Sequence, residues 1–196
     1  MRESKRHDMF FCQLFFPNIL QSALFFYIYH MKRTLSLVMA CLLAITIASA
    51  QTGWVDHKAD ERISVKFPAE PAEVVAGTFA AKDKDNIAYV LTVVDFVKVA
   101  NVDSAALAPV KNTPEFTSQL KVGMAQSLPD VTFEDFKISN WKGNTSYTST
   151  GVDSKKQIYD MFMLLIGSKL YSLSTIRPNG SPTTGRDDFF KSVTLK

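Results

Sequence analysis

Apolar and polar positions are arranged differently in the two parts of this 196-residue chain. Up to residue 50 the apolar residues form two long runs, whereas beyond it short apolar segments alternate with polar turns. Ile63, Val65 and Phe67 alternate with polar residues, which is the period of a half-buried strand that ends at Pro68. The pattern also predicts strands at residues 74–81 and 87–96, joined as a hairpin by the polar residues 82–86.

A helical period replaces the strand period after residue 113. Thr113 suits the N-cap and Pro114 the first helical position, and apolar residues then recur every four positions as far as Pro129. After this helix, apolar segments are separated by very short polar turns, which demand antiparallel neighbours. They predict four strands at residues 131–141, 145–152, 157–166 and 170–177, and a last short helix that begins near Thr184.

From Met161 onward the segment 157–166 is apolar at both odd and even positions, which is typical of a central strand covered on both faces. Strands, a helix, a strand meander and a second helix follow one another along the chain. This order predicts an α+β domain. We expect an antiparallel β-sheet of about six to seven strands with two to three helices packed on it.

The apolar run at residues 35–47 has the features of a secretory signal. Met31, Lys32 and Arg33 form a basic start, and Ala48 and Ala50 place small residues before Gln51. We therefore expect a signal peptide at 31–50, a polar arm at 51–60 and a single α+β domain at 61–196, periplasmic or secreted after cleavage.

Residues 1–30 do not fit a normal signal, because basic clusters flank their apolar run on both sides. The sequence favours an upstream segment that precedes a start at Met31. If Met1 is the true start, the chain is instead a membrane-anchored domain, so we expect membrane contact only through a retained leader.

Removal of the leader changes the charge of the chain. Five of the 22 Lys and Arg residues and two of the 19 Asp and Glu residues fall in the first 50 positions, so the remainder carries no net charge. It also lacks the long basic run expected of a nucleic-acid-binding protein. Both cysteines, Cys12 and Cys41, lie in the leader, and His57 is the one histidine beyond it. This inventory leaves no thiol site and no usual zinc site, so we expect no cofactor.

Two polar residues and one polar loop are functional candidates. His57, with acidic neighbours, suits a metal site or an oriented base. The favoured explanation is that His57 lies in a solvated arm and has no such role. The loop 83–86 lacks the spacing of a calcium-binding loop and is better explained as a hairpin tip. Asp160, inside an apolar strand, is a site candidate if it is buried in a cleft. A water-facing strand end or a pairing with Arg177 on the next strand is favoured.

Aromatic residues are the remaining candidates for contacts with a ligand or partner. Trp141, Tyr147 and Tyr171, together with Trp54, would suit such a surface. Aromatic residues also favour strands for packing reasons alone, and both explanations stay open.

Two segments resemble the ends of PsbP-like domains. The first is Ile63-Ser64-Val65-Lys66-Phe67-Pro68, and the second is Phe189-Phe190-Lys191-Ser192-Val193-Thr194-Leu195. The resemblance covers residues 61–196 and implies an antiparallel sheet flanked by helices. The family includes an extrinsic photosystem subunit, a nuclear-import factor that binds a small GTPase and exported bacterial proteins, mostly with binding or accessory roles. The shared motifs are core and turn residues, so no functional residue is carried over.

Together these observations favour an exported, non-catalytic binding or accessory domain that acts through protein or small-ligand contacts. A carboxylate-based hydrolase or metal-dependent enzyme is the alternative, and a membrane-anchored domain is a further one. The partner or ligand and the oligomeric state are not determined by the sequence.

Overall fold

The computed structural model describes residues 53–196. The expected segment 1–30, the signal peptide 31–50 and its cleavage residues Ala48, Ala50 and Gln51 lie outside the described residues. Within the described residues, none of the helices is long and apolar enough to cross a bilayer.

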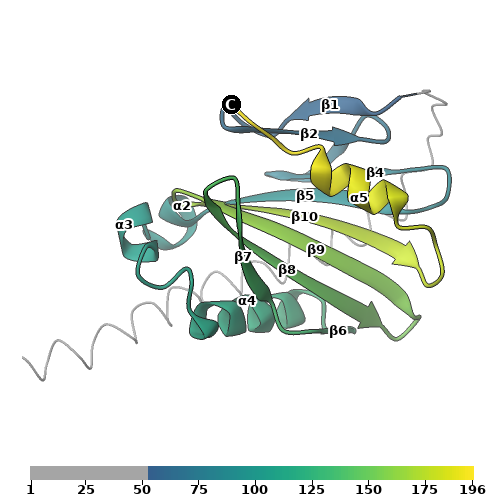
Figure 1. Cartoon of the computed structure of the whole chain (residues 1–196). Coiled ribbons are helices and arrows are strands. Elements are labelled where there is room, and N and C mark those ends of the chain that lie inside the picture. The colour runs from purple at the N-terminus through teal and green to yellow at the C-terminus, as the bar shows by residue number, and fades with distance from the viewer. Residues whose placement is uncertain (1–52) are drawn as a thin grey trace, which may run out of the picture.

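An eight-stranded antiparallel sheet forms the middle layer of the domain (Figure 1). Its order is β3-β4-β5-β10-β9-β8-β6, and β7 also pairs with β8. The strands are β3 (Ala72–Val75), β4 (Thr78–Lys82), β5 (Ala88–Asp95), β6 (Val131–Phe133), β7 (Lys137–Trp141), β8 (Asn144–Asp153), β9 (Gln157–Ile166) and β10 (Lys169–Pro178).

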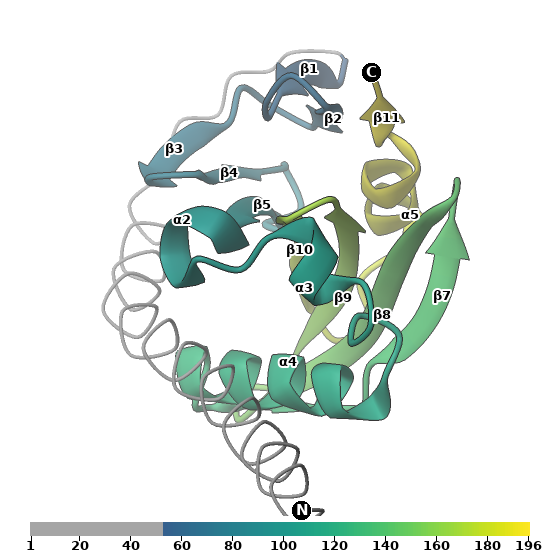
Figure 2. The ribbon, with the colours of Figure 1, turned by 90° about the vertical axis from the view of Figure 1, so that its left-hand side faces the viewer.

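Different elements cover the two faces of this sheet (Figures 1 and 2). On one face lie helix α5 (Thr184–Lys191) and a three-stranded sheet of β1 (Val55–Lys58), β2 (Ile63–Phe67) and β11 (Thr194–Leu195). On the other face lie α2 (Phe96–Ala100), α3 (Ser104–Leu107) and α4 (Pro114–Ser127). The α+β class is confirmed. The strands outnumber the expected six to seven, and the described part has four helices where two to three were expected.

The central strand β9 separates two hydrophobic cores. Phe162 and Leu164 point into the core beneath α5 and β2, whereas Met161, Met163 and Leu165 point into the core beneath α4. Because side chains alternate between faces along a strand, an apolar residue is needed at every position once both faces are covered. The prediction of a central strand is therefore confirmed.

The prediction of a single strand at 74–81 is wrong, because these residues belong to a hairpin of β3 and β4. Gly77 has φ +75°, a left-handed conformation that suits glycine, and its carbonyl accepts a hydrogen bond from the amide of Val93 at 2.8 Å. The predicted hairpin turn at 82–86 is confirmed, because the flanking strands β4 and β5 pair with each other. Residues 55–58, within the expected polar arm, pair as β1 with β2.

The expected single strand at 131–141 is also divided, into β6 and β7, by an extra residue. Phe133 pairs with Gly151 and Lys137 with Thr148, so the three residues 134–136 lie opposite only two residues of β8. This β-bulge shifts the alternation of side chains by one position. As a result Phe133 and Phe136 both enter the core beneath α4. Lys137 therefore faces the α5 side.

Candidate functional site

A small cleft lies between α5 and strands β7 and β8, and we call it the α5 cleft. Its volume is about 250 Å³, smaller than a typical site for a drug-sized ligand. Strand residues form its floor, α5 forms one wall, and Glu134 and Asp135 of the bulge before β7 also line it. Its lining comprises Glu134, Asp135, Lys137, Thr148, Ser149, Thr150, Asp160, Met161, Arg186, Asp187 and Phe190.

Pairing between strands sets the polar groups of the cleft floor. Thr148 lies opposite Lys137 on β7, and Thr150 lies opposite Asp160 on β9. Thr148 and Thr150 are two positions apart on β8, so both side chains point to the same face of the sheet. Asp160 shares this face, because its carboxylate contacts Arg186 on α5. Two hydroxyls therefore lie between an ammonium group and a guanidinium group.

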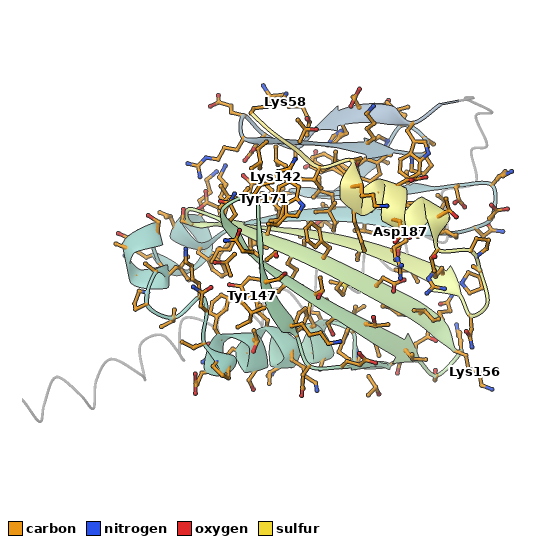
Figure 3. All side chains as sticks on the ribbon, in the orientation of Figure 1. Lys58, Lys142, Tyr147, Lys156, Tyr171 and Asp187 are labelled. Atoms are coloured by element: carbon orange, nitrogen blue, oxygen red, sulfur yellow. The ribbon has the colours of Figure 1, made fainter. Side chains whose placement is uncertain are left out.

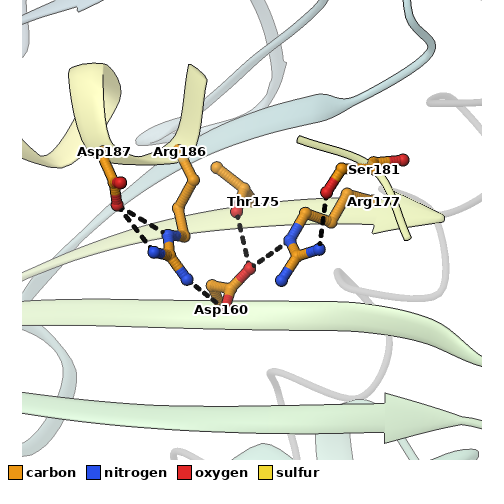
Figure 4. A network of polar contacts seen from close by, with 6 residues as sticks. All are labelled: Asp160, Thr175, Arg177, Ser181, Arg186 and Asp187. Atoms are coloured by element: carbon orange, nitrogen blue, oxygen red, sulfur yellow. Dashed lines mark hydrogen bonds and ion pairs between the residues drawn. The ribbon is translucent and has the colours of Figure 1, made fainter. Parts of the chain in front are cut away.

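Asp160 is the buried anchor of the cleft, with 5% of its surface exposed. Its Oδ2 accepts a hydrogen bond from Arg177 Nε at 2.8 Å and a longer one from Thr175 Oγ1 at 3.5 Å (Figure 4). Its Oδ1 accepts one from Arg186 Nη1 at 3.3 Å. The predicted pairing with Arg177 is confirmed, and the structure also places Asp160 in a cleft. Both carboxylate oxygens are engaged, so this acid holds the two arginines in place.

Arg186 connects the network to α5. Its Nε and Nη2 donate to Asp187 Oδ1 at 2.9 and 2.8 Å. Partial burial acts to lower the pKa of Arg186, but the hydrogen bond to Asp187 and the charge of Asp160 outweigh it and raise that pKa. The guanidinium is therefore a permanent cation on the cleft wall. A guanidinium has five N–H donors, so this side chain has donors beyond those that the two carboxylates use.

Other polar groups of the cleft have no protein partner within the described residues. The hydroxyls of Thr148 and Thr150 and the ammonium of Lys137 make no side-chain hydrogen bond or ion pair there. The Glu134 carboxylate likewise makes no hydrogen bond or ion pair with the described residues. Asp135, by contrast, forms an exposed ion pair with Lys121 at 2.6 Å. The cleft thus combines a satisfied buried network with solvent-accessible groups that have no protein partner among the described residues.

The structure corrects the proposed aromatic contact surface at two positions. Tyr147 and Tyr171, both labelled in Figure 3, are fully buried according to their exposed surface of 0%. Their hydroxyls donate within the protein, Tyr147 to the carbonyl of Lys111 at 2.7 Å and Tyr171 to Asp60 Oδ2 at 2.6 Å. Each phenol therefore packs in a core with its polar end satisfied. Trp141 is half-buried on the β7–β8 hairpin, with Lys142 Nζ 4.4 Å from its ring centre, and its contact role stays a prediction.

His57 packs in a hydrophobic environment that the sequence did not indicate. Its ring lies 4.3 Å from that of Phe79 and 5.7 Å from that of Phe67, and its Nε2 is buried without a hydrogen-bond partner. The prediction that His57 lies in a solvated arm is therefore wrong. Burial lowers the pKa of His57, and the charges of Glu70 and Glu73 oppose that shift without cancelling it.

The loop after β4 is a hairpin tip, as expected. Asp83 Oδ1 accepts from the amides of Asp85 and Ile87, each at 2.9 Å, and its Oδ2 accepts from the Tyr89 hydroxyl at 2.8 Å. Its carboxylate thus organises the turn itself. The described part of the chain holds no cluster of three or more His, Cys, Asp or Glu residues placed to bind a metal ion.

The sequence did not single out Lys137, Thr148, Thr150 or Arg186. The threonines had no distinct signal, because residues 145–150 carry a hydroxyl at every position and neither face of the strand stands out. Arg186 had no local signal either, because its partner Asp160 is 26 positions away.

These features define an antiparallel α+β domain with a small polar cleft beside its last helix. No family model matches the chain, and no curated protein matches it either. Solved structures similar to it include a protein of Bacteroides thetaiotaomicron VPI-5482, with a TM-score of 0.36 and 9% identity. The match covers 68% of this chain and 45% of that protein, so the chain spans less than half of its length.

Another similar structure is cyanobacterial PsbP (CyanoP) from Synechocystis sp. PCC 6803. The TM-score is 0.41 and the identity 9%, with 77% of this chain and 99% of that one covered. A PsbP protein is thus among the similar structures. A likeness at this level transfers no site, ligand or partner to this chain.

Proposed function

We propose that this chain is an exported binding or accessory domain without catalytic chemistry of its own, and that it binds its ligand or partner in the α5 cleft. Export rests on the signal-like residues 31–50. The binding role rests on the geometry of the cleft.

One contrast within the cleft carries this proposal. Asp160, its buried acid, has both oxygens occupied by arginine and threonine donors, which disfavours a role in proton transfer. Thr148, Thr150 and Lys137 lie beside it with their polar groups unpaired. Polar groups that face a cleft and lack protein partners can be satisfied by a bound molecule, whereas a fixed carboxylate keeps the walls of the cleft in place.

Affinity capture from the exporting compartment tests the proposal. The bait is the purified chain, compared with Lys137→Glu and Thr148→Val variants. Lys155→Glu, a charge reversal in the turn between β8 and β9, is the matched control. We expect the wild-type chain and the control to retain the same bound molecule and the two cleft variants to lose it. Equal capture by all four proteins would contradict a role for the cleft.

A further inference from the structure

The charge balance of the α5 cleft restricts what it can bind. Among its lining residues, Asp160 and Asp187 are held by Arg186, with Arg177 behind Asp160. Asp135 is paired with Lys121. These pairs neutralise one another, and the two charged side chains left over are Lys137 and Glu134. The cleft therefore has one cation, Lys137, and one anion, Glu134, that lack an ion-pair partner among the described residues, and only Lys137 can balance a negative charge on a ligand.

The positions of the donors specify where that negative charge would lie. Lys137 stands on β7 directly across from Thr148, and Arg186 reaches the floor from the opposite side at Asp160, across from Thr150. An oxygen acid seated over the two threonines would meet an ammonium on one side, a guanidinium on the other and two hydroxyls beneath. Hydrogen bonds from charged donors to a carboxylate are among the stronger ones in proteins.

The rest of the lining favours an apolar body on the ligand. Phe190 contributes apolar surface, and its ring lies 5.7 Å from that of Phe162 in the neighbouring aromatic cluster. A dianion such as phosphate fits less well, because the cleft has one unpaired ammonium to balance two negative charges. The cleft is also too small for a large ligand.

From these observations we infer that the α5 cleft binds a small monocarboxylate with an apolar chain, held by Lys137, Arg186, Thr148 and Thr150. The inference rests on the proposed binding role of the same cleft and names its ligand class. It accounts for the unpaired donors of the cleft and for the single ammonium without an ion-pair partner.

Titration followed by amide NMR spectra of the purified chain tests it, with hexanoate as the probe. We expect saturable shifts at Lys137, Thr148, Thr150 and Phe190. Hexanamide, which has the same shape without the charge, should bind at least tenfold more weakly, and inorganic phosphate should give no saturable shifts. Lys137→Gln should weaken hexanoate at least tenfold and Lys155→Gln should leave it unchanged, while the spectra themselves show that each variant is folded.

Three outcomes would overturn the inference: no saturable shifts with hexanoate, equal binding of hexanamide, or unchanged binding in Lys137→Gln. If hexanoate fails while capture of a cellular partner still depends on Lys137 and Thr148, the ligand class is wrong and the binding role of the cleft stands. If both fail, the cleft is not a binding site.

Discussion

The hydroxyl of Tyr171 donates a hydrogen bond of 2.6 Å to Asp60 Oδ2 and so joins the two sheets of the domain. Asp60 lies between β1 and β2 of the small sheet, whereas Tyr171 lies on β10 of the large one. Lys169 Nζ reaches the same oxygen at 2.8 Å, and the amide of Arg62 donates to Oδ1 at 2.8 Å. One carboxylate therefore fixes the small sheet against the large one.

The ionised form of Asp60 stabilises the fold. Burial alone raises the pKa of this carboxyl, but the hydrogen bonds from Lys169 and Tyr171 outweigh it and lower that pKa from 3.8 to about 2. A carboxyl whose folded pKa is depressed contributes stability above its unfolded pKa and loses it as the pH falls toward the folded value. We expect Asp60→Asn to lower the free energy of unfolding by about 2 kcal/mol at pH 7.

Urea unfolding at pH 7, 4 and 2.5 checks this effect. The difference between wild type and Asp60→Asn should shrink steadily across that range. Asp135→Asn, which removes one partner of an exposed ion pair, is the matched control and should change the unfolding free energy little at any pH. A difference for Asp60→Asn that stays constant down to pH 2.5 would show that its charge is not the cause.

His57 is expected to make the domain less stable in mild acid. Its folded pKa lies below the ordinary 6.5, so the unfolded chain binds the proton more readily. Stability should therefore fall as the pH drops below about 6.5, because protonation places a charge against Phe79 and Phe67. Melting temperatures at pH 7.5 and 5.5 measure the effect. His57→Phe should remove most of the fall in melting temperature between pH 7.5 and 5.5. If this variant shows a fall of the same size, other titrating groups cause it.

Gly185 allows α5 to pack closely against Tyr89 of the large sheet. A methyl group at this position would overlap the hydroxyl of Tyr89, which donates to Asp83. At an open helical position, alanine in place of glycine stabilises by up to about 1 kcal/mol. Here we expect Gly185→Ala to destabilise by about 1–3 kcal/mol. Chemical denaturation of Gly185→Ala, Tyr89→Phe and the double variant forms a cycle in which the glycine change should cost less once the hydroxyl is absent.

Asp160 is expected to be more important for stability than the exposed acids are. Asp160→Asn removes the charge that Arg177 and Arg186 both contact, and leaves Arg177 buried without a counter-charge. Breaking such a buried pair costs about 3–5 kcal/mol. Replacing both partners, as in Asp160→Leu with Arg177→Met, should recover most of that loss in the same urea measurement. A double variant as unstable as Asp160→Asn would locate the cost in packing rather than in charge.

Much of the fold followed from local patterns, because alternation and turn residues report directly on strands with one buried face. The pattern failed where tertiary structure interrupted it. Val74, Val75 and Phe79 form one apolar segment, so only Gly77 marked the turn between β3 and β4. The bulge had a clearer signal, because an apolar alternation that includes Phe133 resumes out of phase at Phe136.

The candidate cleft was not predicted for a different reason. It exists only because α5 lies over β9, and the packing of one element on another is not encoded in local periodicity. Asp160 was recognised as an unusual residue in an apolar strand, and its partner Arg177 lies on the neighbouring strand. Arg186 comes from a helix beyond the meander, and nothing near it in the sequence connects it to Asp160.

The short strand β11 has a consequence for how the chain acquires this structure during synthesis. Thr194 and Leu195 pair with Ser64 and Ile63, about 130 positions earlier. The ribosome must therefore release residue 195 before the small sheet can close over Phe67 and Phe189, which pack together beneath it. Until that moment the edge of β2 that pairs with β11 stays open, although β1 can already pair with its other edge, and the chain reaches its folded state only after translation of these residues.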